Sequence, residues 1–289
     1  MSSSKRLIIN ADDFGISRSV NLGIVEAAQA GAVTSASMMV NLPDFADAVD
    51  RSTSCPKFSL GLHLNLTVGR PLTNARSLTR GTGEFYPLPS LLARASVGLV
   101  DASDIATECL AQIDRMLDAG IEPTHLDSHR HVHAHPAFTR AVVEAAASRG
   151  IFEIRVPRES FTTNALDLGA SVKKLALRVG TAVSRQRTGR KGTHHFAGVS
   201  LQGGKFFAKR LFHLISSLPP GTTELMTHPG YADASLAARD SYTLERVTEL
   251  RVLCSGEFRD LLERSGVTLT RFGKSGTIAA ADGELAQHH

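Results

Sequence analysis

Short apolar segments and longer amphipathic segments alternate along most of the chain. Period-two alternation or a continuous apolar run predicts strands at residues 7–11, 33–40, 58–66, 124–129, 154–157, 222–228 and 267–272. Helical periodicity predicts helices at residues 17–30, 43–51, 101–119, 136–149, 166–187, 205–216 and 241–264. Strands separated by helices favour a mostly parallel sheet. Roughly seven such units favour an α/β fold of the (β/α)-barrel kind, distorted or incomplete, with an open doubly wound sheet as the alternative.

The same pattern predicts a single domain over residues 1–275 and a flexible tail at 276–289. No GxGxxG segment follows the first strand, which argues against a dinucleotide-binding fold. Residues 70–100 are rich in glycine and proline, so we expect a loop-like insertion beside a site rather than a core element.

Polar residues gather where the predicted strands end. Asp12 and Asp13 follow the first strand, and His63 lies late in the third. His129 and His228 end two later strands. Because the carboxyl ends of parallel strands form the active-site edge of barrels and α/β sheets, we expect these side chains to meet there.

The aspartate pair lies in the segment NADDFG, residues 10–15. Two adjacent carboxylates are costly to desolvate together, and a nearby cation relieves their repulsion. One carboxylate could then bind a metal ion while the other moves protons. A helix N-cap followed by a turn is the alternative interpretation.

Five of the 12 histidines occur in one short tract together with an aspartate: His125, Asp127, His129, His131, His133 and His135. The tract lies between a predicted strand and a predicted helix, unlike a disordered metal-sequestering run. Neutral imidazole is a common ligand of zinc-like metals, and His129, at the end of the strand, is the expected ligand.

The other members of the tract are expected to support this ligand. His125 and Asp127 share its face of the strand and could orient a bound imidazole. His131 and His133 are expected to line the pocket, and His135 is expected to start a helix.

Two histidines outside the tract can also be interpreted as purely structural residues. His63 alternates with leucines in GLHLNLT. A single histidine in such a strand is usually a satisfied core residue, so the interpretation of His63 as a site residue depends on the other motifs. His228 precedes Pro229 and Gly230 and is either a turn residue or a general acid or substrate-binding group at the same rim.

Composition narrows the class of protein. The net charge of +4 comes from scattered residues, and we expect the one basic run, at 185–191, to be a solvated loop, so no nucleic-acid partner is indicated. Three distant cysteines favour a reducing compartment. Neither a membrane span nor a signal peptide is expected, which predicts a cytoplasmic protein.

Four segments together resemble the YdjC family of carbohydrate deacetylases, best known from chitooligosaccharide deacetylases. They are NADDFG (10–15), GLHLNLT (61–67), THLDSHRHVH (124–133) and MTHPGY (226–231), in the family's order. Each is weak alone, but the ordered set is specific. Residues 70–100 and 173–191 depart from the family, and we expect them to determine which sugar is used.

The resemblance implies a barrel-like fold and hydrolysis of an N-acetyl group on an amino sugar, with release of acetate. It also implies one divalent metal ion held by Asp13, His63 and His129, and a cytoplasmic protein that is often dimeric. Zinc or magnesium is expected, and cobalt and manganese are compatible with these ligands. The residues expected to contact substrate are Asn65, Asp127, His131 and His133.

In this scheme Asp12 is the expected base that takes a proton from a metal-activated water as it attacks the acetamide carbonyl. His228 is the expected acid for the leaving amine, with His131 and His133 as alternatives. The rival hypotheses are a metal-dependent phosphoesterase or sugar isomerase on the same fold, and a non-catalytic sugar- or metal-binding protein.

Overall fold

The computed structural model describes residues 4–159, 193, 195–202, 206–273 and 278–280. The helix predicted at 166–187 and the basic run at 185–191 lie outside these residues. In the part of the chain that is described, no helix is long and apolar enough to cross a membrane.

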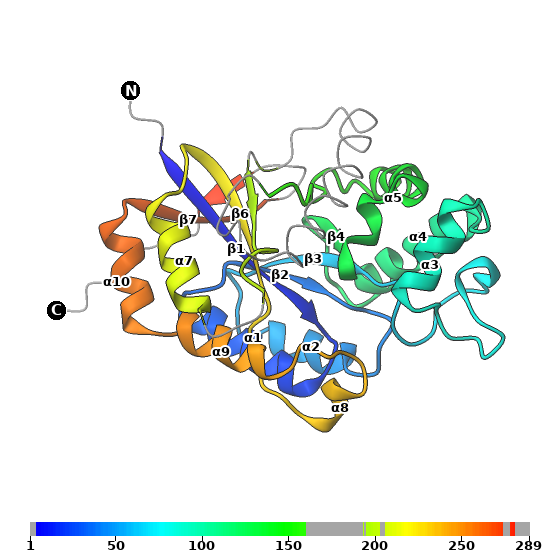
Figure 1. Cartoon of the computed structure of the whole chain (residues 1–289), viewed down its shortest axis with the longest axis horizontal. Coiled ribbons are helices and arrows are strands. Elements are labelled where there is room, and N and C mark those ends of the chain that lie inside the picture. Colours follow the sequence, from blue (N-terminus) through cyan, green and yellow to red (C-terminus); the bar gives the residue numbers. More distant parts are fainter. Residues whose placement is uncertain (1–3, 160–192, 194, 203–205, 274–277, 281–289) are drawn as a thin grey trace.

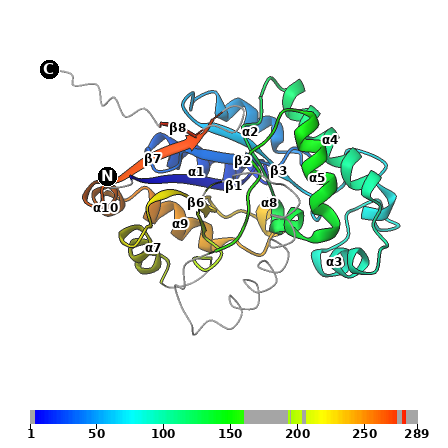
Figure 2. The same cartoon turned by 90° about the horizontal axis from the view of Figure 1, so that it is seen from above.

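One curled sheet of parallel strands organises the molecule (Figure 1). Across the sheet the order is β4 (Leu126–Ser128), β3 (Ser59–Leu64), β2 (Ser35–Met38), β1 (Lys5–Phe14), β6 (Gly221–Thr227) and β5 (His195–Ala197). β7 (Val267–Phe272) lies beside the start of β1 and pairs with it, as Figure 2 shows. β8 (Ile278–Ala280) runs antiparallel to β7, so part of the predicted tail is a strand.

The two edges of the sheet are joined by residues 151–159 rather than by a further regular strand. Ile154 forms an isolated parallel bridge with Leu126 of β4, and Glu159 forms one with Phe196 of β5. The predicted strand at 154–157 is therefore reduced to a bridge. The result is an incomplete (β/α) barrel, which confirms the predicted fold class.

The helices pack around this sheet, with α7, α9 and α10 on one side and α3, α4 and α5 on the other (Figure 1). They are α1 (Arg18–Gln29), α2 (Phe45–Ser52), α3 (Leu88–Ser96), α4 (Ala102–Asp118), α5 (Pro136–Ser148), α7 (Phe207–Ser216), α8 (Ala234–Ala237), α9 (Leu244–Leu253) and α10 (Gly256–Arg264). Short 3-10 turns occupy Arg76–Leu78 and His129–Ala134.

Period-two alternation separates an apolar outer face of the sheet from a polar inner face. On β1, Leu7 and Ile9 join the hydrophobic core, whereas Asn10 and Asp12 lie among polar groups of the inner face. On β3, Leu62 is a core residue and His63 contacts polar partners. The fold therefore places chemistry-bearing residues on the concave side.

Two predicted segments differ from the structure in informative ways. The long helix predicted at 241–264 is two helices, because Ser255 accepts a hydrogen bond from the Phe258 amide and begins α10. Residues 70–100 contain α3 and bury Leu78, Phe85 and Leu91 in the core, so they are not simply a loop.

A close helix–loop contact sets the position of the turn after β6. A Cβ on Gly23 of α1 would lie 2.6 Å from the Gly230 Cα, two residues beyond His228. The Tyr231 amide donates to the Ser19 carbonyl at 3.2 Å, which holds the same turn against α1. Gly23 thus allows the helix to approach the loop that carries His228.

Gly23→Ala is expected to destabilise the protein by about 1–2 kcal/mol, because overpacking against backbone outweighs the gain in helix propensity. Urea unfolding measures the change. Gly256→Ala in α10 is the matched control, since nothing lies within 4 Å of its added Cβ. Equal stability of the two variants would contradict the proposed contact.

Candidate metal centre

Three buried side chains from β1, β3 and the turn after β4 converge on one point. The Asp13 Oδ1 lies 2.8 Å from the His129 Nδ1 and 3.1 Å from the His63 Nε2. Atoms of all three residues lie within 4.8 Å of one another. A carboxylate with two imidazoles is a donor set that suits a divalent transition metal.

Asp13 reaches this point because β1 is irregular at its end. The pairing register with β2 shifts between Ala11 and Phe14, and Asp13 has a left-handed backbone with φ of 69°. In a regular strand, Asp12 and Asp13 would point to opposite faces. The irregularity brings both carboxylates to the same cavity.

Hydrogen bonding fixes how His63 faces the cluster. Its Nδ1 lies 2.7 Å from the Asp127 Oδ1, so this nitrogen carries the proton. The Nε2 of a neutral ring then directs a lone pair at the Asp13 carboxylate, an arrangement of two acceptors that needs a cation between them. A proton or a metal ion satisfies it, and the donor set therefore fits the implied metal.

The pKa values of His63 and Asp13 also reflect the need for a cation between these two side chains. Burial lowers the pKa of His63, but Asp127 and Asp13 outweigh it and raise this pKa to about 10. Burial raises the pKa of Asp13, but Arg246 and the imidazoles outweigh it and hold this pKa well below its usual range. The metal-free cluster thus retains a proton on His63, with which a metal ion would compete.

Arg155 joins the inner-face carboxylates. Its Nη1 and Nη2 donate to the two oxygens of Asp12 at 2.6 and 2.7 Å. Its Nη2 also contacts Asp127 at 2.6 Å, and its Nε donates to Glu224 at 2.7 Å. Arg155 therefore fixes the orientation of Asp12 and of the carboxylate that orients His63.

Helix α9 supports the opposite side of the cluster. Arg246 is fully buried and its Nη2 donates to the Asp13 Oδ2 at 2.6 Å. Glu249, one turn later, accepts from the His228 amide at 2.7 Å and from the Tyr242 hydroxyl at 2.6 Å. The Tyr242 ring packs edge-on against the His228 imidazole, with centroids 5.4 Å apart.

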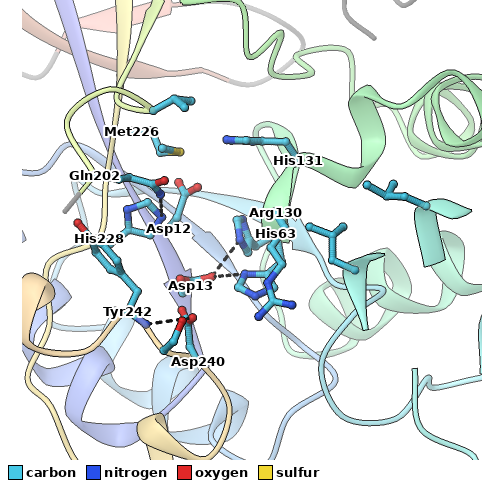
Figure 3. Close-up of a pocket in the computed structure, with 15 residues that line it drawn as sticks. Asp12, Asp13, His63, Arg130, His131, Gln202, Met226, His228, Asp240 and Tyr242 are labelled. Atoms are coloured by element: carbon cyan, nitrogen blue, oxygen red, sulfur yellow. Dashed lines mark hydrogen bonds and ion pairs between the residues drawn. The ribbon is translucent and has the colours of Figure 1, made fainter. Parts of the chain in front are cut away.

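A cavity of about 560 Å³ opens onto these groups (Figure 3). Figure 3 shows Asp12 and His228 on one side of Asp13, and His63 with Arg130 on the other. The cavity wall consists of Asp12, Asp13, His63, Leu88, Leu92, His129, Arg130, His131, Val199, Gln202, Met226, His228, Asp240, Ser241 and Tyr242. Its size is that of a small-molecule site, and it combines apolar and polar walls.

Backbone strain is concentrated at this cavity. In the described part of the chain, the non-glycine residues with positive φ are Asp13, Arg130 and His131, and all three line it. Such conformations cost about 1–3 kcal/mol each and persist where surrounding structure enforces them. The strain therefore marks the same region as the cluster of ionisable groups.

Some expected site residues do not reach the cavity wall. The Asn65 side chain instead holds its own loop, accepting from the Thr67 and Val68 amides and donating to Asn41. Asp127 lies behind His63, with Ser37 and Arg155 as further partners. These placements do not support substrate binding by Asn65 or Asp127, but they fit an orienting role for Asp127.

Of the remaining histidines of the tract, one lines the cavity and the others do not. His131 lines the cavity, and burial together with Arg155 holds its pKa well below the usual value. His133 is not on the wall, because its ring contacts the Ser128 hydroxyl and the Arg155 carbonyl. His125 stacks on Phe272 and does not line the cavity. His135 caps α5, as predicted.

Sequence reasoning missed Arg155, Arg246 and Glu249. Arg155 had a weak signal, as a charged residue inside an apolar strand-like segment. Arg246 and Glu249 lie three apart on a helix that follows the His228 motif, and this spacing puts them on one helix face. Their partners in β1 and after β6 are distant in sequence, so no local pattern identified them.

The fold and the cluster define a barrel-type α/β protein with a candidate mononuclear metal centre at the carboxyl edge of its sheet. A family model described as YdjC-like protein matches residues 6–264, and the chain belongs to this family. The resemblance seen in the four sequence segments is thereby confirmed.

Curated relatives match over nearly the whole chain. A carbohydrate deacetylase of Brevibacillus brevis is 37% identical over 275 residues, covering 94% of this chain and 100% of the relative. A chitooligosaccharide deacetylase of Yersinia pestis is 32% identical and covers 93% of this chain and 98% of its own. Both relatives are thus named as deacetylases that act on carbohydrates.

A solved structure supports the fold alone. The crystal structure of a putative cellobiose-phosphate cleavage protein from Enterococcus faecalis superposes with a TM-score of 0.74 at 24% identity. It covers 93% of this chain and 98% of that chain.

Glu224 makes the stability of the folded protein depend on pH. Burial outweighs the nearby Arg155 and raises the pKa of Glu224 to about 7 from 4.5. The unfolded chain releases this proton at lower pH than the folded chain, so Glu224 lowers stability as pH rises from 4.5 to 7. In the chelator-treated protein, Glu224→Gln should gain stability relative to wild type across this window, by at most about 3 kcal/mol.

Urea unfolding at several pH values measures this difference. Glu144→Gln, on the exposed face of α5, is the control variant. A Glu224→Gln difference that is flat with pH would show that Glu224 is already ionised.

Proposed function

We propose that the protein is a metal-dependent carbohydrate deacetylase that removes an N-acetyl group from an amino sugar or an N-acetylated oligosaccharide. The observation that carries this proposal is the cavity in which Asp13, His63 and His129 converge beside a second carboxylate, Asp12. Pure binding has no evident need of that second carboxylate. The names of the relatives supply the substrate class.

Asp13, His63 and His129 are the proposed metal ligands, and zinc or magnesium is the proposed ion, with cobalt and manganese compatible. When bound, the ion supplies a Lewis acid that polarises the acetamide carbonyl and lowers the pKa of water. A cytoplasmic location and a homodimeric state are part of the proposal and follow from the family resemblance.

Asp12 is the proposed general base. Arg155 holds both of its oxygens, and the Asn10 side-chain amide donates to one of them at 2.8 Å. This fixed orientation leaves Asp12 on the cavity wall, where it accepts the proton of the attacking water. Collapse of the tetrahedral intermediate then breaks the C–N bond and releases acetate.

His228 is the proposed general acid, which gives the leaving amine its proton. It lines the cavity, its amide is held by Glu249, and its ring packs on Tyr242. His133 is unsuitable, because both of its ring nitrogens have protein partners and it is off the cavity wall. His131 is the alternative that mutation must distinguish.

Acetate release from a panel of N-acetylated saccharides with added divalent metals tests the activity. We expect turnover that chelation abolishes and metal restores. Phosphate release from sugar phosphates instead would favour the phosphoesterase hypothesis. Tight sugar binding without turnover across all metals would favour the non-catalytic hypothesis.

Variants test the roles of individual residues. Asp12→Asn is expected to keep its metal and lose about 10²- to 10⁴-fold in kcat, the usual contribution of a positioned base. His63→Ala and His129→Ala are expected to lower metal content, measured by elemental analysis. Retained turnover in Asp12→Asn removes Asp12 as the base, and wild-type metal content in both histidine variants refutes the ligand set.

Comparing His228→Gln with His131→Gln identifies the acid. The larger loss of kcat with unchanged metal content is expected for His228→Gln. A larger loss for His131→Gln would transfer the acid role to His131.

A further inference from the structure

The two oxygens of Asp13 have different partners. Oδ1 faces His129 and His63 at 2.8 and 3.1 Å, whereas Oδ2 accepts from the Arg246 Nη2 at 2.6 Å. The carboxylate is thus divided between the ligand cluster and an arginine on α9. Nothing about the aspartate alone dictates this division, because a free carboxylate can offer both oxygens to a cation.

Other contacts hold the arginine in place. The Arg246 Nη2 also donates to the Asp240 Oδ2 at 2.8 Å, and its Nε donates to the Tyr242 carbonyl at 2.7 Å. The side chain is fully buried, so its position is fixed by these partners. The planar guanidinium matches this pair of carboxylates and the carbonyl in a way that a flexible ammonium does not.

We propose that Arg246 is a positioning residue for the metal centre, and that it reserves Oδ1 of Asp13 for the ion by occupying Oδ2. This inference rests on the proposed function, in which Asp13 is a metal ligand. Arg246 touches neither the ion nor the substrate in this scheme. It acts through Asp13, as hydrogen-bond partners of ligating carboxylates do in other metal sites.

Asp240 makes the arrangement compatible with cation binding. An uncompensated guanidinium beside a ligand would repel a divalent ion and withdraw charge from the carboxylate. The Asp240 carboxylate balances that charge at 2.8 Å, so Arg246 can hold Asp13 without adding a net positive charge. Arg246 and Asp240 therefore form a neutral support for the ligand.

Arg246→Lys tests the proposal because it keeps the positive charge but loses the planar guanidinium, which reaches several acceptors at once. The metal dissociation constant is expected to rise by about 10- to 100-fold, the usual effect of losing a partner that orients a ligand. Competition with a chelator measures it for Zn²⁺ and for Co²⁺. The visible spectrum of the Co²⁺ protein should also change, because the freed Oδ2 can join the coordination sphere.

A purely structural role makes a different prediction. An arginine that only fastens α9 to β1 would lower the melting temperature of the metal-free protein and leave metal affinity and the Co²⁺ spectrum unchanged. That result overturns the proposal. Arg239→Lys is the matched control, since Arg239 pairs with Asp44 and contacts no proposed ligand. We expect its metal affinity to equal that of wild type.

Asp240→Asn is a second variant that decides the question if Arg246→Lys does not fold. It preserves shape but leaves the Arg246 charge unbalanced, so metal affinity is expected to fall at least several-fold. Unchanged affinity in a folded Asp240→Asn variant also overturns the proposal. A wild-type protein that binds no metal contradicts the proposed function itself, whereas equal affinity of wild type and both variants contradicts this inference alone.

Discussion

The contact of one carboxylate oxygen with two imidazole nitrogens is the constraint on which the site depends. Asp13 Oδ1 lies near both the His63 Nε2 and the His129 Nδ1, and these groups are buried together. Because Asp127 takes the proton-bearing nitrogen of His63, the ring presents an acceptor to another acceptor. The fold is stable there only with a proton or a metal ion in the cluster.

Buried ion pairs connect this cluster to other residues inside the barrel. Arg155 connects the proposed base, Asp12, with Asp127 behind His63, and Arg246 connects Asp13 with Asp240. Removing one partner of a buried pair leaves an uncompensated charge and typically costs about 3–5 kcal/mol. The orientation of the base and of the ligands is therefore tied to the stability of the protein.

The regular part of this design is visible in the sequence. Alternation in β3 places His63 opposite Leu62 and Leu64, and the order of strands and helices predicts the incomplete barrel. The shared edge of the parallel strands also predicts that the aspartate pair meets the histidines His63, His129 and His228 there. These features follow from local periodicity and one rule of topology, so a single sequence is enough to find them.

The irregular part is not visible in the same way. The left-handed backbone at Asp13 depends on how β1 pairs with β2, and the partners Asp13 and Arg246 are 233 residues apart. Asn65 has the spacing of a site residue but satisfies its own loop. Apolar periodicity also continues across Ser255, which hides the break between α9 and α10. Long-range pairing determines the backbone and the partners of Asp13, whereas the roles of Asn65 and Ser255 depend on local hydrogen bonds that hydrophobic periodicity does not reveal.

Anomalous X-ray diffraction from crystals of the protein saturated with Zn²⁺ is the decisive test of the proposed metal centre. One strong peak is expected at the zinc absorption edge, within about 2.0–2.3 Å of atoms of Asp13, His63 and His129. A peak bound by other residues, or no peak at saturating metal, would contradict it.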